Sequence, residues 1–233
     1  IAMGNNIVGN RQAGIRSLVT INMGSAKTPT SEIINEIREA KRRDYDLNGF
    51  YLTDIDTSSP AQLAAMKEVY EFIKSNYPDH LVLANESGEL VQQEMANYAD
   101  IHIISNVTAD AYINYYRKPT GAWENNTANG NRIMHVIREA SPDQYDEIIR
   151  LSRTRNAQWL YINDNKGTAT DEPTNFAQLV AKINELGMPQ WPVTPAFPTA
   201  TPTAAPTSTP TAAPSVAPAP TNPQPTTVPT TGP

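Results

Sequence analysis

Carboxylate side chains come directly after two short apolar runs of this 233-residue chain. Asp54 and Asp56 follow the run Gly49–Thr53, and Glu86 follows the next run, His80–Ala84. Two carboxyl groups held close together can supply the acid and base, or the nucleophile, that cleaves a glycosidic bond. We therefore nominate Asp54 as a catalytic residue, with Asp56 or Glu86 as its partner.

Amide, ring and carboxyl groups at similar positions are candidate sugar-binding groups. They are Asn22, Asn85, Asn106, Trp123, His135, Tyr161 and Asp164. Plainer interpretations stay open. Asparagines often close turns, a histidine within an apolar run is usually a hydrogen-bonded core residue, and a tryptophan on a polar loop can serve as a cover. Asp54 and Asp56 can likewise be turn or helix-capping residues.

Other chemistries lack the residues that they require. The chain has no cysteine, no G-x-G-x-x-G after an apolar run and no G-x-S-x-G, which argues against thiolate zinc sites, a dinucleotide site and a serine nucleophile elbow. Asn163-Asp164-Asn165 resembles part of a calcium loop but lacks the required glycine and distal glutamate. We expect neither a cofactor nor a bound metal.

The overall charge limits the class of partner. A net charge of −6 and a pI near 5.1 disfavour binding to nucleic acid or to anionic membrane surfaces. No apolar run is long enough to span a bilayer. A neutral or cationic polyhydroxylated ligand suits the polar positions better.

Short β-branched or aliphatic runs alternate with stretches of helical period, which predicts βα units and a parallel sheet. Each run is nearly continuous in apolar residues, as expected for strands covered on both faces. The predicted strands are Ile15–Ile21, Gly49–Thr53, His80–Ala84, Asp100–Ser105, Arg132–Ile137 and Gln158–Ile162. Parallel strands bring their carboxyl ends, and hence the nominated residues, to one edge.

Helices are predicted between these strands. One spans Ser31–Arg43, and Ser-Pro or Pro-Thr pairs start three more at Pro60, Pro142 and Pro173, the last ending at Gly187. Two α/β architectures fit about six such units. One is an open doubly wound sheet, and the other is a TIM-barrel-like (β/α)8 fold that is incomplete at the N-terminus by one or two units.

The C-terminal segment differs in composition from the rest. Residues 189–233 contain 14 of the 20 prolines, interleaved with Thr and Ala, and no charged residue follows Glu185. Such a segment cannot form a core, so we predict a folded domain over residues 1–188 and a disordered linker over 189–233. Pro/Thr tracts of this kind are typical of glycosylated stalks, which predicts a secreted, extracellular or cell-wall-associated protein.

Several segments resemble, in order and spacing, the spherulin 4 family of secreted barrel proteins, which are related to microbial hydrolases of amino-sugar exopolysaccharides. They are Ala13-Gly14-Ile15, Asn48 to Asp54, Leu81 to Asn85, Tyr98 to Ile101, Arg132 to His135 and Ala157 to Asp164. The resemblance implies a (β/α)8 barrel. It also implies an adjacent Asp-Glu pair in active members where this chain has Thr53 and Asp54, and often a glutamate where it has Asn106.

Two functions from different classes follow. The first is a secreted glycoside hydrolase that acts on an extracellular or cell-wall polysaccharide, including amino-sugar polymers, by carboxylate acid/base catalysis. The alternative is a noncatalytic carbohydrate-binding or wall-associated protein that has lost the acidic pair. In both, the Pro/Thr segment joins the domain to a further module or a wall anchor beyond Pro233.

Overall fold

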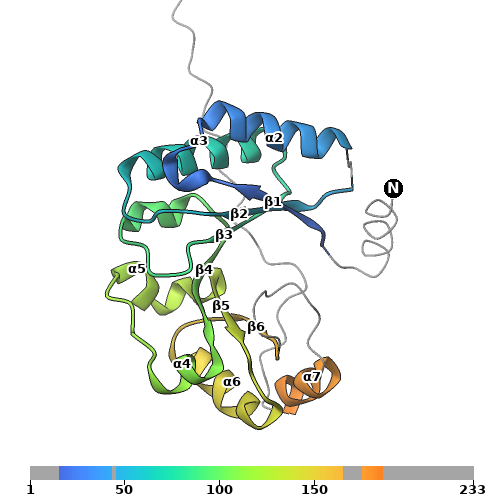
Figure 1. Ribbon diagram of the computed structural model, residues 1–233, viewed down its shortest axis with the longest axis vertical. Coiled ribbons are helices and arrows are strands. Elements are labelled where there is room, and N and C mark those ends of the chain that lie inside the picture. Colours follow the sequence, from blue (N-terminus) through green and yellow to red (C-terminus); the bar gives the residue numbers. More distant parts are fainter. Residues whose placement is uncertain (1–15, 44–45, 165–174, 186–233) are drawn as a thin grey trace, which may run out of the picture. The chain divides into compact units, whose positions relative to one another are not determined.

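The computed structural model describes residues 16–43, 46–164 and 175–185, and these contain one six-stranded parallel sheet (Figure 1). The predicted linker and the predicted helix start at Pro173 lie outside the described residues. The strands are β1 (Leu18–Asn22), β2 (Gly49–Thr53), β3 (Leu81–Asn85), β4 (Ile101–Thr108), β5 (Ile133–Arg138) and β6 (Trp159–Ile162). All six predicted strands are therefore confirmed, with β1 starting later and β4 ending later than predicted.

The strand order is β1-β2-β3-β4-β5-β6, so every strand pairs with the next one along the chain. A doubly wound sheet requires a reversal of this order, and the described sheet contains none. The open doubly wound alternative is therefore wrong. Consecutive parallel pairing is the arrangement of TIM-barrel-like folds, and within the described residues it runs from β1 to β6.

The helices begin with local signals that the sequence carries. Ser59 caps α3 by accepting a hydrogen bond from the Gln62 amide at 3.3 Å, and Pro60 occupies the first turn. Ser141 and Gln144 form a capping box ahead of α6. The helices are α2 (Thr30–Arg43), α3 (Pro60–Asn76), α4 (Ala109–Asn114), α5 (Ala122–Asn125), α6 (Tyr145–Thr154) and α7 (Phe176–Glu185).

None of the helices in the described ranges is long and apolar enough to cross a bilayer. Short 3-10 turns occupy Gly24–Ala26, Gln93–Asn97, Thr127–Arg132 and Pro142–Gln144. In the first of these, Gly24 has a φ of 65°, and a Cβ there would lie 2.1 Å from the Thr28 hydroxyl oxygen. Only glycine fits at that position.

One face of the sheet, here called the helix-bearing face, can be followed strand by strand, because paired residues of parallel strands point the same way. Its residues include Ile21, Leu52, Ala84, His102, Ile133, Ile137 and Ile162. On β1–β3 it packs against Ile33 and Ile37 of α2 and against Met66 and Ile73 of α3. The helices α2 and α3 lie side by side (Figure 1).

The same face of β5 and β6 packs against Tyr112 of α4, Ile148 and Ile149 of α6 and Leu179 of α7. Helices from both ends of the described sheet thus cover one face. This single-sided covering is the second feature of a TIM-barrel-like arrangement, in which the other face turns inward.

The other face, here called the second face, carries the alternate residues of each strand. Its polar and aromatic members are Thr20, Asn22, Tyr51, Thr53, Asn85, Asn106, Arg138, Trp159 and Tyr161, and all are exposed or half-buried. The expectation of strands that are apolar on both faces is wrong for these positions. The physical reason is the period-two alternation of a strand, which places the apolar residues mainly under the helices.

Candidate functional site

The turns at the carboxyl ends of the strands contain a group of residues with left-handed backbones. For side chains other than glycine this conformation is disfavoured, and such residues tend to be retained at functional sites. Each residue of the group follows β1, β2, β3 or β5 within four positions. They are Ser25 (φ 46°), Ala26 (φ 65°), Asp54 (φ 57°), Ser87 (φ 55°) and Glu139 (φ 57°).

Asp54 is exposed and is held by the turn that follows β1. The Ser25 hydroxyl donates to Asp54 Oδ1 at 2.5 Å, and the Ser25 amide donates to the Asp54 carbonyl at 2.8 Å. Two bonds from one residue fix both the backbone and the carboxylate of Asp54. A carboxylate that is oriented but still open to solvent can exchange a proton with a ligand.

Tyr51 and Asn85 form a hydrogen-bonded pair on the second face. Asn85 Nδ2 donates to the Tyr51 hydroxyl at 2.7 Å, and Asn85 Oδ1 accepts from the Ser87 hydroxyl at 2.8 Å. Burial raises the pKa of Tyr51, and the hydrogen bond from Asn85 opposes that rise. The phenol therefore keeps its proton and can donate it in a hydrogen bond to a ligand.

Asn106 lies on the same face, in β4, which is the third strand along the sheet from β1. Its Oδ1 accepts a hydrogen bond from Arg138 Nε at 3.1 Å. Next to β5, Tyr161 pairs in register with Val136 and Trp159 with Met134, so both rings belong to the second face. Amides, a guanidinium and flat rings on one surface suit a polyhydroxylated ligand.

Asp56 and Asn22 serve local turns. Asp56 Oδ1 accepts from the Ser58 amide at 2.9 Å and from its hydroxyl at 2.7 Å, and these hydrogen bonds lower the pKa of Asp56. Asn22 Oδ1 accepts from the Gly24 amide at 2.7 Å. Both residues lie at the carboxyl edge, and their hydrogen bonds close local turns. Turn closure was the plainer of the two interpretations that the sequence allowed.

Glu86 points away from its neighbour Asn85, into the helix-bearing side. Its Oε1 lies 2.7 Å from His102 Nδ1, and both side chains are fully buried. Burial raises the pKa of Glu86, and His102 opposes that rise. Among the described residues Glu86 Oε2 has no partner. The structure therefore does not bring Glu86 together with Asp54 at the open edge.

Trp123 and His135 also belong to the helix-bearing side. The Trp123 ring lies edge-on to His102, 5.1 Å between ring centroids, and the Arg132 guanidinium lies 5.6 Å from it. His135 is fully buried and lies 2.7 Å, through Nδ1, from the Tyr112 hydroxyl. Burial and then the charge of Arg155 lower the pKa of His135 to about 3. These contacts are those of core residues.

Asp164 follows β6 and is half-buried. Burial raises the pKa of Tyr145, and the charge of Asp164 adds to that rise. The carboxylate therefore lies near the start of α6. Among the described residues, no three histidine, aspartate or glutamate side chains are grouped closely enough to hold a metal ion.

Four residues of the site escaped the sequence reasoning. Tyr51 alternates with Phe50 and Leu52 in its strand, and that period-two pattern would have placed it on the second face. Arg138 ends a strand whose other second-face residues, Met134 and Val136, are apolar, so no such pattern marks it. Ser25 and Glu139 have no such signal, since their position depends on left-handed turns that non-glycine residues seldom adopt.

The fold and the site together define an α/β protein with a single-wound, TIM-barrel-like parallel sheet whose second face carries polar side chains toward the carboxyl ends of the strands. Residues 6–183 match the family described as Spherulation-specific family 4. The chain belongs to this family, as its resemblance in sequence predicted. No curated protein matches the chain.

Proposed function

We propose that the protein is a secreted glycoside hydrolase that acts on an extracellular or cell-wall polysaccharide, with Asp54 as its acid or base. The observation that carries the proposal is the placement of Asp54. It is exposed at the carboxyl edge, in a left-handed backbone conformation, with its carboxylate held by Ser25. In single-wound βα folds this edge is where active sites lie.

The second face supplies groups suited to a sugar chain. The Tyr51 hydroxyl, which accepts from Asn85, keeps its own proton for a ligand oxygen. The rings of Trp159 and Tyr161 stand on the same face. Flat apolar faces and directed hydrogen bonds are the two features that a sugar ring requires of its site.

A second carboxylate is needed for hydrolysis, at a carboxyl separation of about 5–9.5 Å. Asp56 is occupied by its turn and Glu86 by His102. Glu139 is exposed and directly follows β5 in the same backbone conformation as Asp54. We propose Glu139 as the partner of Asp54, in place of the two residues nominated from the sequence. Because β3 and β4 lie between their strands, this pairing requires the sheet to curve so that the two carboxyl groups approach each other across the second face.

The experiment measures new reducing ends from amino-sugar and neutral polysaccharides at pH 4–8. Asp54→Asn and Glu139→Gln should each lower the rate by at least about 100-fold, the usual size of an acid or base contribution. Asp56→Asn is the matched control, because it makes the same change two residues away. Equal losses in Asp54→Asn and Asp56→Asn, or no product from the unaltered protein, would contradict hydrolysis.

A second candidate, carbohydrate binding without cleavage, is favoured by one observation. Two of the three nominated carboxylates are engaged in structural contacts. Retardation of the protein in gels that contain the polysaccharide, with no reducing ends formed and no change in Asp54→Asn, is the result expected of this candidate.

A further inference from the structure

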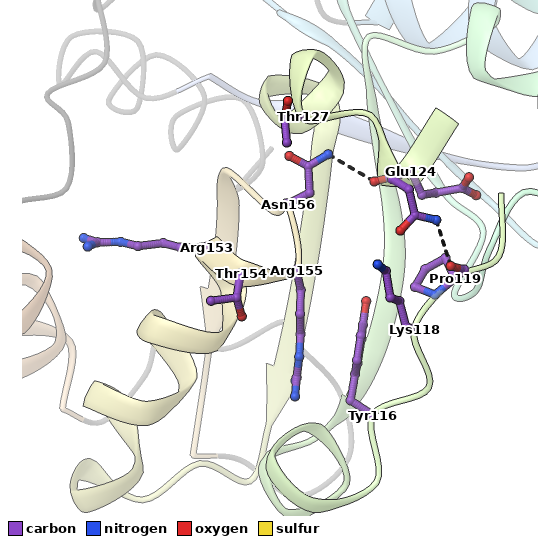
Figure 2. Close-up of a pocket in the computed structure, with 10 residues that line it drawn as sticks. Tyr116, Lys118, Pro119, Glu124, Thr127, Arg153, Thr154, Arg155 and Asn156 are labelled. Atoms are coloured by element: carbon purple, nitrogen blue, oxygen red, sulfur yellow. Dashed lines mark hydrogen bonds between the residues drawn. The ribbon is translucent and has the colours of Figure 1, made fainter. Parts of the chain in front are cut away.

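A cavity of about 390 Å³ lies on the helix-bearing side, between the loop that follows α4 and the turn that follows α6. Its wall includes Tyr116, Lys118, Thr127, Thr154, Arg155 and Asn156 (Figure 2). The volume is within the range of small-molecule sites. Because Tyr116 contacts buried His135, the cavity belongs to the face opposite Tyr51 and Asn85.

Arg155 provides a fixed positive charge in this cavity. Its guanidinium lies 4.3 Å from the Tyr112 ring centroid and 4.0 Å from that of Tyr116, and Nη1 donates to the Tyr112 carbonyl at 2.5 Å. A guanidinium has five N–H donors, so some remain for a ligand after its contacts with the Tyr112 carbonyl and side chain. A guanidinium already ordered by two rings loses little freedom on binding, which favours a planar or tetrahedral oxyanion.

Lys118 adds a second positive charge. Figure 2 shows it beside Tyr116 and across from Arg155, with its amino end toward Asn156 while the Arg155 guanidinium points toward the other end of the cavity. Arg153, although part of the wall, extends away from that space in the same view. The Thr127 and Thr154 side chains add hydroxyl groups to the lining. The lining therefore combines two cations with neutral hydrogen-bonding groups.

The one acidic residue of the wall does not cancel these charges. Glu124 is 3% exposed, and its two oxygens accept from the Leu90 amide at 2.7 Å and from Gln93 Nε2 at 2.9 Å. Figure 2 shows its carboxylate turned away from Lys118 and Arg155. The chain as a whole carries a net charge of −6, whereas the lining of this cavity presents positive charge.

The cavity is also held in shape by side-chain bonds to the backbone. Asn156 Nδ2 donates to the carbonyls of Glu124 at 3.0 Å and Asn126 at 2.7 Å, which ties the turn to the loop. Asn125 Nδ2 donates to the carbonyls of Pro119 and Gly121. A site whose walls are already joined does not have to be ordered by its ligand.

We propose that this cavity binds a small polyhydroxylated anion of the sugar-phosphate class. The oxyanion contacts Lys118 and Arg155, and the hydroxyl groups contact the neutral wall. The site is separate from the carboxyl edge and does not depend on hydrolysis there.

The test is calorimetric titration of the full chain with glucose 6-phosphate, with inorganic phosphate and glucose as comparison ligands. Glucose 6-phosphate should bind more tightly than inorganic phosphate, and glucose should not bind. Lys118→Gln should weaken binding of glucose 6-phosphate by about tenfold, which corresponds to about 1.4 kcal/mol. Arg117→Gln is the matched control, since Arg117 is exposed next to Lys118 but does not line the cavity, and it should change the affinity by less than about twofold.

Three results would overturn the proposal: glucose binding as tightly as glucose 6-phosphate, equal losses in Lys118→Gln and Arg117→Gln, or no heat of binding up to about 10 mM ligand. Inorganic phosphate binding as tightly as glucose 6-phosphate would reject the sugar component. Asp54→Asn should leave the affinity unchanged, which separates failure of this site from failure of the hydrolase.

Discussion

Asn85 and Glu86 are neighbours in the chain, yet they serve opposite faces of the sheet. Asn85 is half-buried beside Tyr51, where the phenol keeps a proton to share. The Glu86 side chain is fully buried against His102, whose ring in turn contacts Trp123 edge-on. On the second face polar groups remain partly hydrated and available, whereas on the helix-bearing face Glu86 and His102 are shut off from water and bonded to each other.

The comparison explains why residue type alone is a poor guide to a site. A carboxylate is the usual catalytic group, but a buried carboxylate bonded to a histidine is inaccessible to a polymer. An amide and a phenol are less reactive, but at the second face they can meet a ligand. Three substitutions test this division, in descending order of expected effect.

The largest effect is expected from Glu86→Ala. Removal of the carboxylate leaves His102 buried without its partner, which costs about 3–5 kcal/mol in the free energy of unfolding. Urea unfolding measures the loss. Glu86→Gln should recover part of it, since the amide oxygen can still accept a hydrogen bond from the imidazole.

The matched control is Asn85→Ala, one residue away on the second face. It should cost less than about 1 kcal/mol, because the groups that lose their bonds are open to water. Comparable losses in the two alanine variants would contradict the division between the faces.

The next effect concerns His135, whose pKa is lowered from 6.5 to about 3 by burial and by Arg155. Above pH 6.5 both the folded and the unfolded states are neutral at this residue. As the pH falls from 6.5 toward 3, the unfolded state takes up a proton that the folded state does not, so stability falls by about 1.4 kcal/mol per pH unit at most.

Thermal unfolding between pH 7 and pH 4 measures this dependence. The His135→Gln variant should show a shallower fall than the unaltered chain, whatever its stability at pH 7. Parallel pH profiles in the two proteins would show that His135 already binds a proton in the folded state.

The smallest stability effect is expected from Tyr51→Phe. Loss of the hydroxyl removes the bond from Asn85, at about 0.5 kcal/mol, the low end for a hydrogen bond whose groups are open to water. Polysaccharide affinity should fall by about fivefold, which corresponds to the loss of one hydrogen bond to the ligand. The control is Tyr98→Phe, at a half-buried tyrosine that is bonded to Glu94 before β4, and it should leave the affinity unchanged.

The strands could be predicted from the sequence because β-branched runs between helix-starting Ser-Pro pairs are local signals. The choice between the two α/β architectures could not, because strand order depends on which runs pair across the chain. That order became visible only in pairs such as Leu18 with Gly49 and Met134 with Trp159. The spacing of the units was compatible with both architectures.

The site was predicted less completely. Placing Asp54 at the carboxyl edge needed only the end of β2. Glu86 continues the alternation of β3, with Ala84 on the helix-bearing face and Asn85 on the second face, so it returns to the helix-bearing face, which its position at the carboxyl end of the strand did not reveal. The core role of His135 was one of the two interpretations open from its apolar surroundings. Tyr51 was overlooked because its strand was treated as uniformly apolar, although its alternation with Phe50 and Leu52 was present.

The consecutive order of the strands also has a consequence for synthesis and folding. Gly49 meets Leu18 behind it and Leu81 ahead of it, so within the described sheet a strand pairs with the unit made just before it. Loop closure is short at each addition, and a nascent chain can extend its sheet as each unit leaves the ribosome. The order of translation and the order of strands in the sheet are then the same.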